Sequence, residues 1–117
     1  MSGVSQTVSS WTTKVAAAHT TTHLPPERAV ITTPALVALM ERCIAAAEAP
    51  RQSDGGRWES IAADVKHRGG ARTGETITVR AERAAAAHND RVLWQATVTA
   101  EDGRLIAEGT IERAWEA

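Results

Sequence analysis

A threonine and a glutamate lie eight residues apart at the start of the clearest helical segment of the chain. Thr33 precedes Pro34, and we expect Thr33 to cap the helix and Pro34 to be its first helical residue, where a missing N–H costs nothing. At 100° per residue, Glu41 falls on the margin of the apolar face of this helix. A carboxylate there is partly withdrawn from water yet within reach of a bound molecule, which suits acid–base or nucleophilic chemistry. By itself, Glu41 is better explained as a boundary ion-pair partner of Arg42 or Arg113, and position alone does not make it catalytic.

His67 is a second candidate for proton transfer, in a segment of alternating polarity. Its neighbours Lys66 and Arg68 disfavour a further positive charge, so the imidazole suits the role of a neutral base. A solvated strand end would explain the same residues without any chemistry. His19 and His23, four residues apart, have no Cys, Asp or Glu beside them to complete a metal site, so we expect no metal.

The helix that carries Glu41 has a continuous apolar face, which predicts a long helix packed on a sheet. The residues on this face are Leu36, Leu39, Met40, Cys43, Ile44 and Ala47. Because Cys43 is the only cysteine and lies on this face, we expect a buried, inert thiol and not a nucleophile.

After the helix, the hydrophobic period changes from helical to alternating and stays alternating to the end of the chain. Strands are predicted over residues 61–67, 76–82, 92–100 and 105–111, with turns at residues 88–90 and 101–103 and a linker over 50–57. The first two strands are expected to be half-buried, with Ile61, Ala63, Val65 and His67 on one side. A Thr-rich strand is predicted over residues 15–24, and residues 1–14 as a flexible segment. Together these elements predict a single α+β domain over residues 1–117, with one long helix covered by an antiparallel sheet of about five strands.

Composition excludes several classes of function. The net charge of −1 gives no general attraction to nucleic acid or to a membrane surface, and no apolar run approaches the roughly 18 residues of a membrane-spanning helix. The N-terminus lacks the basic and apolar regions of a secretory signal, so we expect a cytoplasmic protein. The sequence has no phosphate-binding or dinucleotide-binding glycine motif, and its two Gly-Gly pairs are most simply turns.

The chain resembles the hot-dog thioesterases of the fluoroacetyl-CoA thioesterase type over about residues 21–115. Three groups of residues carry this resemblance: Thr33-Pro34 followed by Glu41, then His67 followed by Gly74, and finally Glu108-Gly109 leading to Arg113. The resemblance implies a hot-dog fold, a hydrolytic site made by Thr33, Glu41 and His67, and a homodimer with the site near the subunit interface. It also implies an acyl-thioester substrate, with coenzyme A as part of the substrate and no separate cofactor.

Further residues are candidates for contact with that substrate. They are Ser60, Gly69, Gly70 and Arg113 for substrate binding, and Lys66, Arg68, Arg72, Arg80 and Arg83 as a basic region that suits the phosphates of coenzyme A. Two positions depart from the family's pattern, because Ser60 stands where the family usually has glycine and Ala71 where it often has threonine. The chain also has no phenylalanine and therefore lacks an aromatic lid, so we expect no special preference for fluoroacetyl thioesters.

These features lead to one hypothesis and two alternatives. The hypothesis is a thioesterase that hydrolyses a small or medium acyl thioester, in which Glu41 attacks the carbonyl or orients water, His67 transfers protons and Thr33 aids positioning. The first alternative is a non-hydrolytic member of the same fold, which binds an acyl thioester or acts on a biosynthetic intermediate. The second is a purely structural dimer.

Overall fold

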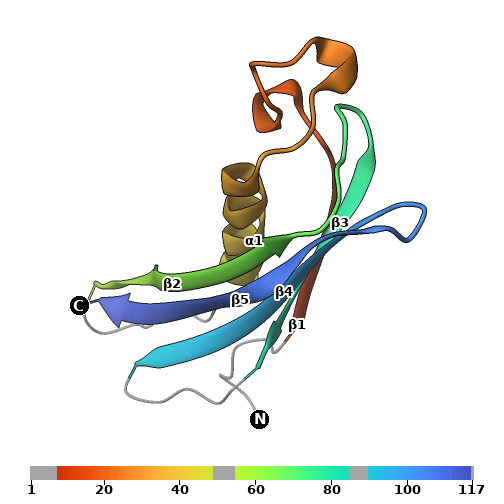
Figure 1. The fold of residues 1–117 in the computed structure, drawn as a ribbon. Coiled ribbons are helices and arrows are strands. Elements are labelled where there is room, and N and C mark those ends of the chain that lie inside the picture. The colour runs from red at the N-terminus through yellow and green to blue at the C-terminus, as the bar shows by residue number, and fades with distance from the viewer. Residues whose placement is uncertain (1–7, 49–54, 85–89, 117) are drawn as a thin grey trace.

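The computed structural model describes residues 8–48, 55–84 and 90–116, which form one helix on one face of a five-stranded sheet (Figure 1). The elements are β1 (Val8–Lys14), two 3₁₀ turns (Ala17–His19 and Pro26–Arg28), α1 (Thr33–Ala47), β2 (Arg57–His67), β3 (Thr76–Arg83), β4 (Arg91–Ala100) and β5 (Leu105–Glu116). Every strand pairing is antiparallel, and the order β1-β3-β4-β5-β2 leaves β1 and β2 at the edges. This is the α+β architecture that the sequence predicts. Within the described ranges, no helix is long and apolar enough to cross a membrane.

The apolar face of α1 packs against the sheet as predicted. Its buried residues are Leu36, Leu39, Met40, Cys43, Ile44 and Ala47. The sheet supplies alternate residues of its central strands, which are Ile77, Val79 and Ala81 of β3 and Val92, Trp94, Ala96, Val98 and Ala100 of β4. The Cys43 thiol donates to the carbonyl oxygens of Ser9 (3.4 Å) and Val79 (3.5 Å), so it is buried as expected.

The start of α1 differs from the prediction by one residue. Thr32 is the N-cap, because its Oγ1 accepts a hydrogen bond from the Ala35 amide at 3.2 Å, and Thr33 is the first helical residue. Two adjacent threonines each satisfy the sequence preference for a cap, and only the chain's entry direction decides between them. The prediction of Thr33 as the cap was therefore wrong, and its hydroxyl is released for other contacts.

The first strand also lies elsewhere than expected. Residues 8–14, which were expected to be flexible, form β1 and pair in unbroken register with β3, from Val8 opposite Glu82 to Lys14 opposite Thr76. The predicted strand over residues 15–24 is instead a 3₁₀ turn at Ala17–His19, followed by an isolated bridge to the segment before α1. The run of alanines has low strand propensity, and the His19 Nδ1 accepts a hydrogen bond from the Ala16 amide at 3.0 Å, which closes the turn.

Strand β2 is longer than predicted and is interrupted by a bulge. The register with β5 shifts between Ser60 and Ala62, so the expected alternation does not extend back to Ile61, whose exposed fraction is 44%. In the monomer, residues 61–64 of β2 are all exposed. The prediction that this strand is half-buried was therefore wrong for these residues. Edge position explains the exposure, because β2 has a neighbour on one side only.

The turn between β4 and β5 is the one predicted. Gly103 has a φ of +93°, which glycine adopts without steric cost, and the Ala100 and Arg104 backbones are hydrogen-bonded across it at 2.9 Å. Of the other predicted turn, residues 88 and 89 lie outside the described residues, as do residues 50–54 of the predicted linker. Arg57, at the end of that linker, is already part of β2.

Candidate active site

Thr33 and His67 meet at the N-terminal end of α1. The Thr33 Oγ1 lies 2.9 Å from the Nδ1 of His67, although the two residues are 34 positions apart in the sequence. Thr33 comes from the first turn of α1, and His67 is the last residue of β2. Both side chains are exposed, so the pair is open to a ligand.

Backbone hydrogen bonds hold these two residues together. The Ile31 amide donates to the Ala71 carbonyl at 2.8 Å, which joins the segment before Thr33 to the segment after His67. The Thr32 amide donates to the His19 carbonyl at 2.9 Å on the other side. Ala71, which stands where the family often has threonine, is fully buried and packs in the core. A threonine at this position would place its hydroxyl out of reach of water.

The Gly69-Gly70 segment begins two residues after His67 and packs tightly against its neighbours. A Cβ on Gly69 would lie 3.0 Å from the Leu105 carbonyl oxygen, and a Cβ on Gly70 would lie 3.2 Å from a methyl group of Val30. The structure therefore places both glycines beside the Thr33–His67 pair. Their predicted role in substrate binding stays a prediction.

Arg104 ties this glycine segment to the β4–β5 turn. Its guanidinium donates to the Gly70 carbonyl at 2.8 Å and forms ion pairs with Asp102 and Glu75. The hydrogen bonds from Arg104 lower the pKa of Asp102, and the hydrogen bonds to Asp102 and then Glu75 raise the pKa of Arg104. The segment after His67 is thus held by charge-assisted hydrogen bonds.

Glu41 does not join the Thr33–His67 pair within one chain. It lies eight residues further along α1, which is about 12 Å along the helix axis. Its side chain is half-buried, and no hydrogen bond or salt bridge links it to another described residue. The ion pairs expected from the sequence are also absent from the described part of the chain, because Arg42 lies over the Trp11 ring at 4.6 Å and Arg113 binds Glu48.

The other two predicted binding residues, Ser60 and Arg113, meet at the opposite end of α1. Arg113 donates from Nε and Nη2 to the two carboxylate oxygens of Glu48, both at 2.8 Å, and from Nη1 to the Ser60 Oγ at 2.9 Å. The side chains of Arg113 and Glu48 are only 10% and 7% exposed. We call Glu48, Ser60 and Arg113 the clamp, because they join α1, β2 and β5. The place of Ser60 and Arg113 in substrate binding stays a prediction, and the structure gives both an internal partner.

The charges around the clamp favour the protonated arginine. Hydrogen bonds to Glu48 raise the pKa of Arg113, burial opposes this rise, and the charges of Glu48, Glu41 and Glu59 add to it. Beside the clamp, Trp58 and Trp115 pack edge to face across β2 and β5, with ring centroids 5.5 Å apart and planes at 75°. This end of the helix is therefore a buried, internally paired cluster.

Glu48 was not among the candidates from the sequence, although a signal for it existed. It follows the last residue of the apolar face, Ala47, and lies four residues after the buried Ile44, so its position on the core side was predictable. Its partner was not, because nothing local connects it to a strand 65 residues later.

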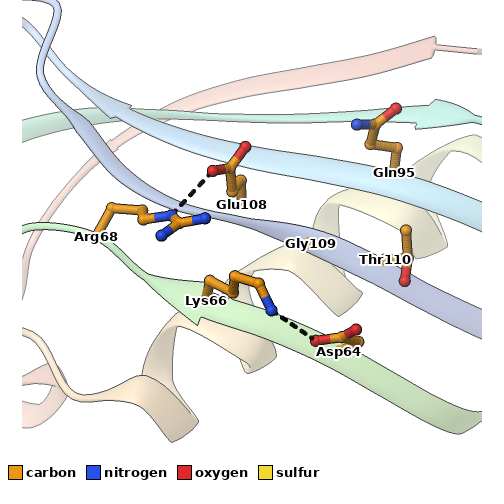
Figure 2. Close-up of a pocket in the computed structure, with 7 residues that line it drawn as sticks. All are labelled: Asp64, Lys66, Arg68, Gln95, Glu108, Gly109 and Thr110. Carbon is orange, nitrogen blue, oxygen red and sulfur yellow. Dashed lines mark hydrogen bonds and ion pairs between the residues drawn. The ribbon is translucent and has the colours of Figure 1, made fainter.

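A hollow on the outer face of the sheet, away from α1, is the alternative place for a ligand (Figure 2). It is lined by Asp64, Lys66, Arg68, Gln95, Glu108, Gly109 and Thr110. Lys66 pairs with Asp64 at 3.7 Å and Arg68 with Glu108 at 3.0 Å. On β3, Arg80 pairs with Glu82 at 3.3 Å. Three of the five cations expected to serve coenzyme A are thus neutralised by carboxylates, which weakens the prediction of a basic phosphate site.

The Thr33–His67 pair can therefore transfer protons at an open site. A neutral imidazole has one donor and one acceptor nitrogen. The Thr33 hydroxyl can accept a hydrogen bond from a protonated Nδ1 or donate one to an unprotonated Nδ1. In the described part of the chain, no group of three or more His, Cys, Asp or Glu residues could hold a metal ion. An acid–base centre of this kind needs a carboxylate or a water beside it to complete a hydrolytic reaction.

The sequence and the fold both match known proteins. The model of a protein family described as FlK, fluoroacetyl-CoA-specific thioesterase, matches residues 11–115. The solved structure of the fluoroacetyl-CoA thioesterase FlK is 28% identical, with a TM-score of 0.81 over 97% of this chain and 87% of that chain. No curated protein sequence matches the chain.

Two further solved structures show the same fold at lower identity. A thioesterase superfamily member from Thermus thermophilus is 21% identical, with a TM-score of 0.80 over 99% of this chain and 86% of that chain. A hot-dog-like protein from Thermanaerovibrio acidaminovorans is 18% identical, with a TM-score of 0.82 over 97% of this chain and 83% of that chain. The architecture described above is therefore the hot-dog fold that the sequence predicts.

Proposed function

We propose that this chain, which belongs to the fluoroacetyl-CoA-specific thioesterase family and is a thioester hydrolase, cleaves a small or medium acyl thioester of coenzyme A at the Thr33–His67 pair. The observation that carries this proposal is the 2.9 Å contact between the Thr33 Oγ1 and the His67 Nδ1 at an exposed helix N-terminus. A mutant of the FlK enzyme has been solved with fluoroacetate and CoA bound, so a solved relative at 28% identity accommodates both parts of such a substrate.

The residues of the pair divide the reaction between them. In the proposal, the His67 Nδ1–H donates to the Thr33 Oγ1, which leaves Nε2 as the base. Nε2 takes a proton as water adds to the acyl carbon, and it returns this proton to the thiolate when the C–S bond breaks. The alternative route, in which Glu41 attacks the carbonyl itself, uses the same imidazole in the second step.

The backbone of the first helical turn supports the carbonyl oxygen. Ala35 and Leu36 donate their amides to Thr32, and Pro34 has no N–H. The amide of Thr33 is therefore the donor left over in this turn, and it lies at the positive end of the helix dipole. We assign it to the oxyanion that develops in the transition state.

A second subunit completes the site in this proposal. Strand β2 is a sheet edge with exposed side chains on both faces, and pairing with its own copy would cover that edge. Because Glu41 lies about 12 Å along α1 from Thr33, we infer that the carboxylate near each Thr33–His67 pair comes from the partner's helix. The protein then acts as a homodimer with two shared sites.

The acyl group is the least constrained part of the substrate. The chain contains no phenylalanine to form an aromatic lid, and the Ser60 hydroxyl is engaged by Arg113. We therefore expect similar rates for acetyl and fluoroacetyl thioesters. The proposed compartment remains the cytoplasm, and no nucleic acid or membrane partner is proposed.

The test combines a substrate panel with subunit mixing. Purified protein should hydrolyse acyl-CoA esters of two to eight carbons, and Glu41→Gln and His67→Ala homodimers should each be inactive. After equal amounts of the two inactive proteins are unfolded together and refolded, the mixture should regain about a quarter of the wild-type activity, because about half of the dimers are mixed and each of these has one of its two sites intact. No hydrolysis by the wild type would disprove the proposed reaction, and inactive mixed dimers would disprove only the shared site.

A non-hydrolytic role is the second candidate, and it is favoured by the absence of a carboxylate partner for the Thr33–His67 pair among the described residues. In that case, a non-hydrolysable thioether analogue of acetyl-CoA should raise the melting temperature of the wild type without any turnover of the ester itself.

A further inference from the structure

Strands β2 and β5 approach each other at Gly109 more closely than any side chain would allow. A Cβ on Gly109 would lie 2.7 Å from the Val65 Cα and 3.0 Å from the Asp64 carbonyl carbon, and closer still to the Asp64 carbonyl oxygen. All three atoms belong to the β2 backbone, so no side-chain rotation can make room. Figure 2 shows Gly109 on β5 where Asp64 and Lys66 of β2 lie beside it.

This contact lies directly before His67 on the same face of the strand. Gly109 is paired with Val65, and Ala107, two residues earlier on β5, is paired with His67. Side chains two apart on a strand share a face, so Val65 and His67 are neighbours on the side that faces α1. The position of the β2 backbone at Val65 therefore sets how far the imidazole reaches toward Thr33.

The other side of His67 is fixed independently. The amides of Arg68 and Gly69 both donate to the Ile106 carbonyl, at 2.7 Å and 3.1 Å, and the Arg68 side chain pairs with Glu108. His67 is thus held between the close approach at Gly109 and these two hydrogen bonds. Because these hydrogen bonds fix the end of β2, this end cannot shift to compensate when a side chain at position 109 pushes the β2 backbone away.

We propose that Gly109 is a positioning residue for catalysis, which places His67 within hydrogen-bond distance of Thr33 by letting β2 lie directly against β5. This inference rests on the proposed role of His67. Carbon atoms in contact lie about 3.5–4.0 Å apart, so an alanine at position 109 must push the β2 backbone away by about 1 Å. A misplacement of this size typically lowers the rate by about 10²-fold.

The experiment compares Gly109→Ala with a control on the same strand. Glu112→Ala removes a surface ion pair with Arg91 (3.9 Å) but leaves the contact of Gly109 with the β2 backbone unchanged, so kcat should stay within about twofold of wild type. Gly109→Ala should lower kcat by about 100-fold with little change in KM, in protein that is still folded by circular dichroism and unchanged in size by gel filtration.

A double mutant separates positioning from general destabilisation. If Gly109 acts through the Thr33–His67 contact, Gly109→Ala should lower kcat by less than about threefold in a Thr33→Val background, where that contact is already lost. A merely structural role would lower kcat as much in this background as in the wild type. Should Gly109→Ala fail to fold, Gly69→Ala gives a milder push from the other side of His67, because its Cβ would meet the Leu105 carbonyl oxygen at 3.0 Å.

The outcomes decide the proposal in either case. A folded variant with wild-type kcat, or an equal loss of kcat with and without Thr33→Val, would overturn it. Failure of the proposed function is separate, because it would appear as a wild type that hydrolyses no acyl-CoA or as a fully active His67→Ala protein.

Discussion

The two ends of α1 hold two polar clusters that are built in opposite ways. At the C-terminal end, the Glu48 and Arg113 side chains of the clamp are almost fully buried. The Nε, Nη1 and Nη2 atoms of Arg113 all donate to Glu48 or Ser60. At the N-terminal end, Thr33 and His67 share one hydrogen bond and are otherwise open to solvent. A buried, internally paired cluster is poorly accessible to a ligand, whereas an exposed one with free hydrogen-bonding groups is accessible.

This difference indicates which cluster stabilises the fold and which carries out chemistry. A buried arginine is tolerated only when a carboxylate and further acceptors surround it, so the clamp is expensive to break. The Thr33–His67 pair is too exposed to contribute much stability. Mutations should therefore divide cleanly between effects on unfolding and effects on rate.

The largest effect is expected from His67→Ala. Loss of the base should lower kcat by about 10²–10⁴-fold, while the melting temperature should change little because the side chain is exposed. Steady-state hydrolysis of the best acyl-CoA, beside a thermal melt, tests both halves. A His67→Ala protein with a lower melting temperature but wild-type kcat would show that His67 stabilises the fold and does not carry out the reaction.

Next in size is Glu48→Gln, which leaves the Arg113 charge buried without its counter-charge. The free energy of unfolding should fall by about 3–5 kcal/mol, measured by urea denaturation. Glu82→Gln is the matched control, because its ion pair with Arg80 is about half exposed and such surface pairs contribute about 0–1 kcal/mol. If the free energy of unfolding falls by similar amounts in the two variants, the clamp does not stabilise the fold more than a surface ion pair does.

The adjacent threonines give a smaller but sharper contrast. Thr32→Ala removes the cap and should cost about 1 kcal/mol of stability with wild-type kcat. Thr33→Val keeps the cap and should lower kcat while the melting temperature stays within about a degree or two, since only an exposed hydrogen bond is lost. Reversed results would mean that Thr33 caps the helix in solution.

The smallest effect concerns pH and the exposed pair of Asp102 and Arg104. Arg104 lowers the pKa of Asp102 in the folded state below the ordinary value of 3.8, so the pair stabilises the fold above that value. This contribution is lost as the pH falls through the lowered pKa. The melting temperatures of wild type and Asp102→Asn should therefore differ slightly at pH 7 and converge once the pH has fallen below the lowered pKa of Asp102. A difference that persists at low pH would show that the effect is not ionic.

The sequence predicted the parts of the fold that bury an apolar face. The helix from Thr33 onwards and the alternation of β3 and β4 follow directly from the period of their hydrophobic residues. The alternation predicted from Leu105 was wrong at the start of β5, where Leu105 is exposed and Ile106 is buried, because the register with β4 shifts between Val98 and Thr99. β1 was missed because Ser9, Trp11 and Thr13 face the core with little apolar contrast to their neighbours. The bulge in β2 was missed because it is a shift of register against β5, which becomes visible only when the paired strand is known.

The candidate site was only partly accessible from the sequence. Glu41, Thr33 and His67 came from residue types, spacing and a family resemblance, and the structure brings two of them together. The pairing of Arg113 with Glu48 could not be predicted, because it joins residues 65 positions apart. Gly109 was among the residues that carry the family resemblance, but its close contact with β2 was not predictable, since a glycine without a positive φ shows its role only when the neighbouring backbone is known.

The tryptophans give the molecule a built-in spectroscopic signal. With no tyrosine in the chain, its near-ultraviolet absorption comes essentially from four indoles, and two of them, Trp58 and Trp115, are crossed at 75°. Rings this close and this oblique couple their electronic transitions, which should give a pair of circular dichroism bands of opposite sign. Those bands would vanish when β2 leaves β5, so the separation of these strands can be followed optically without any added label.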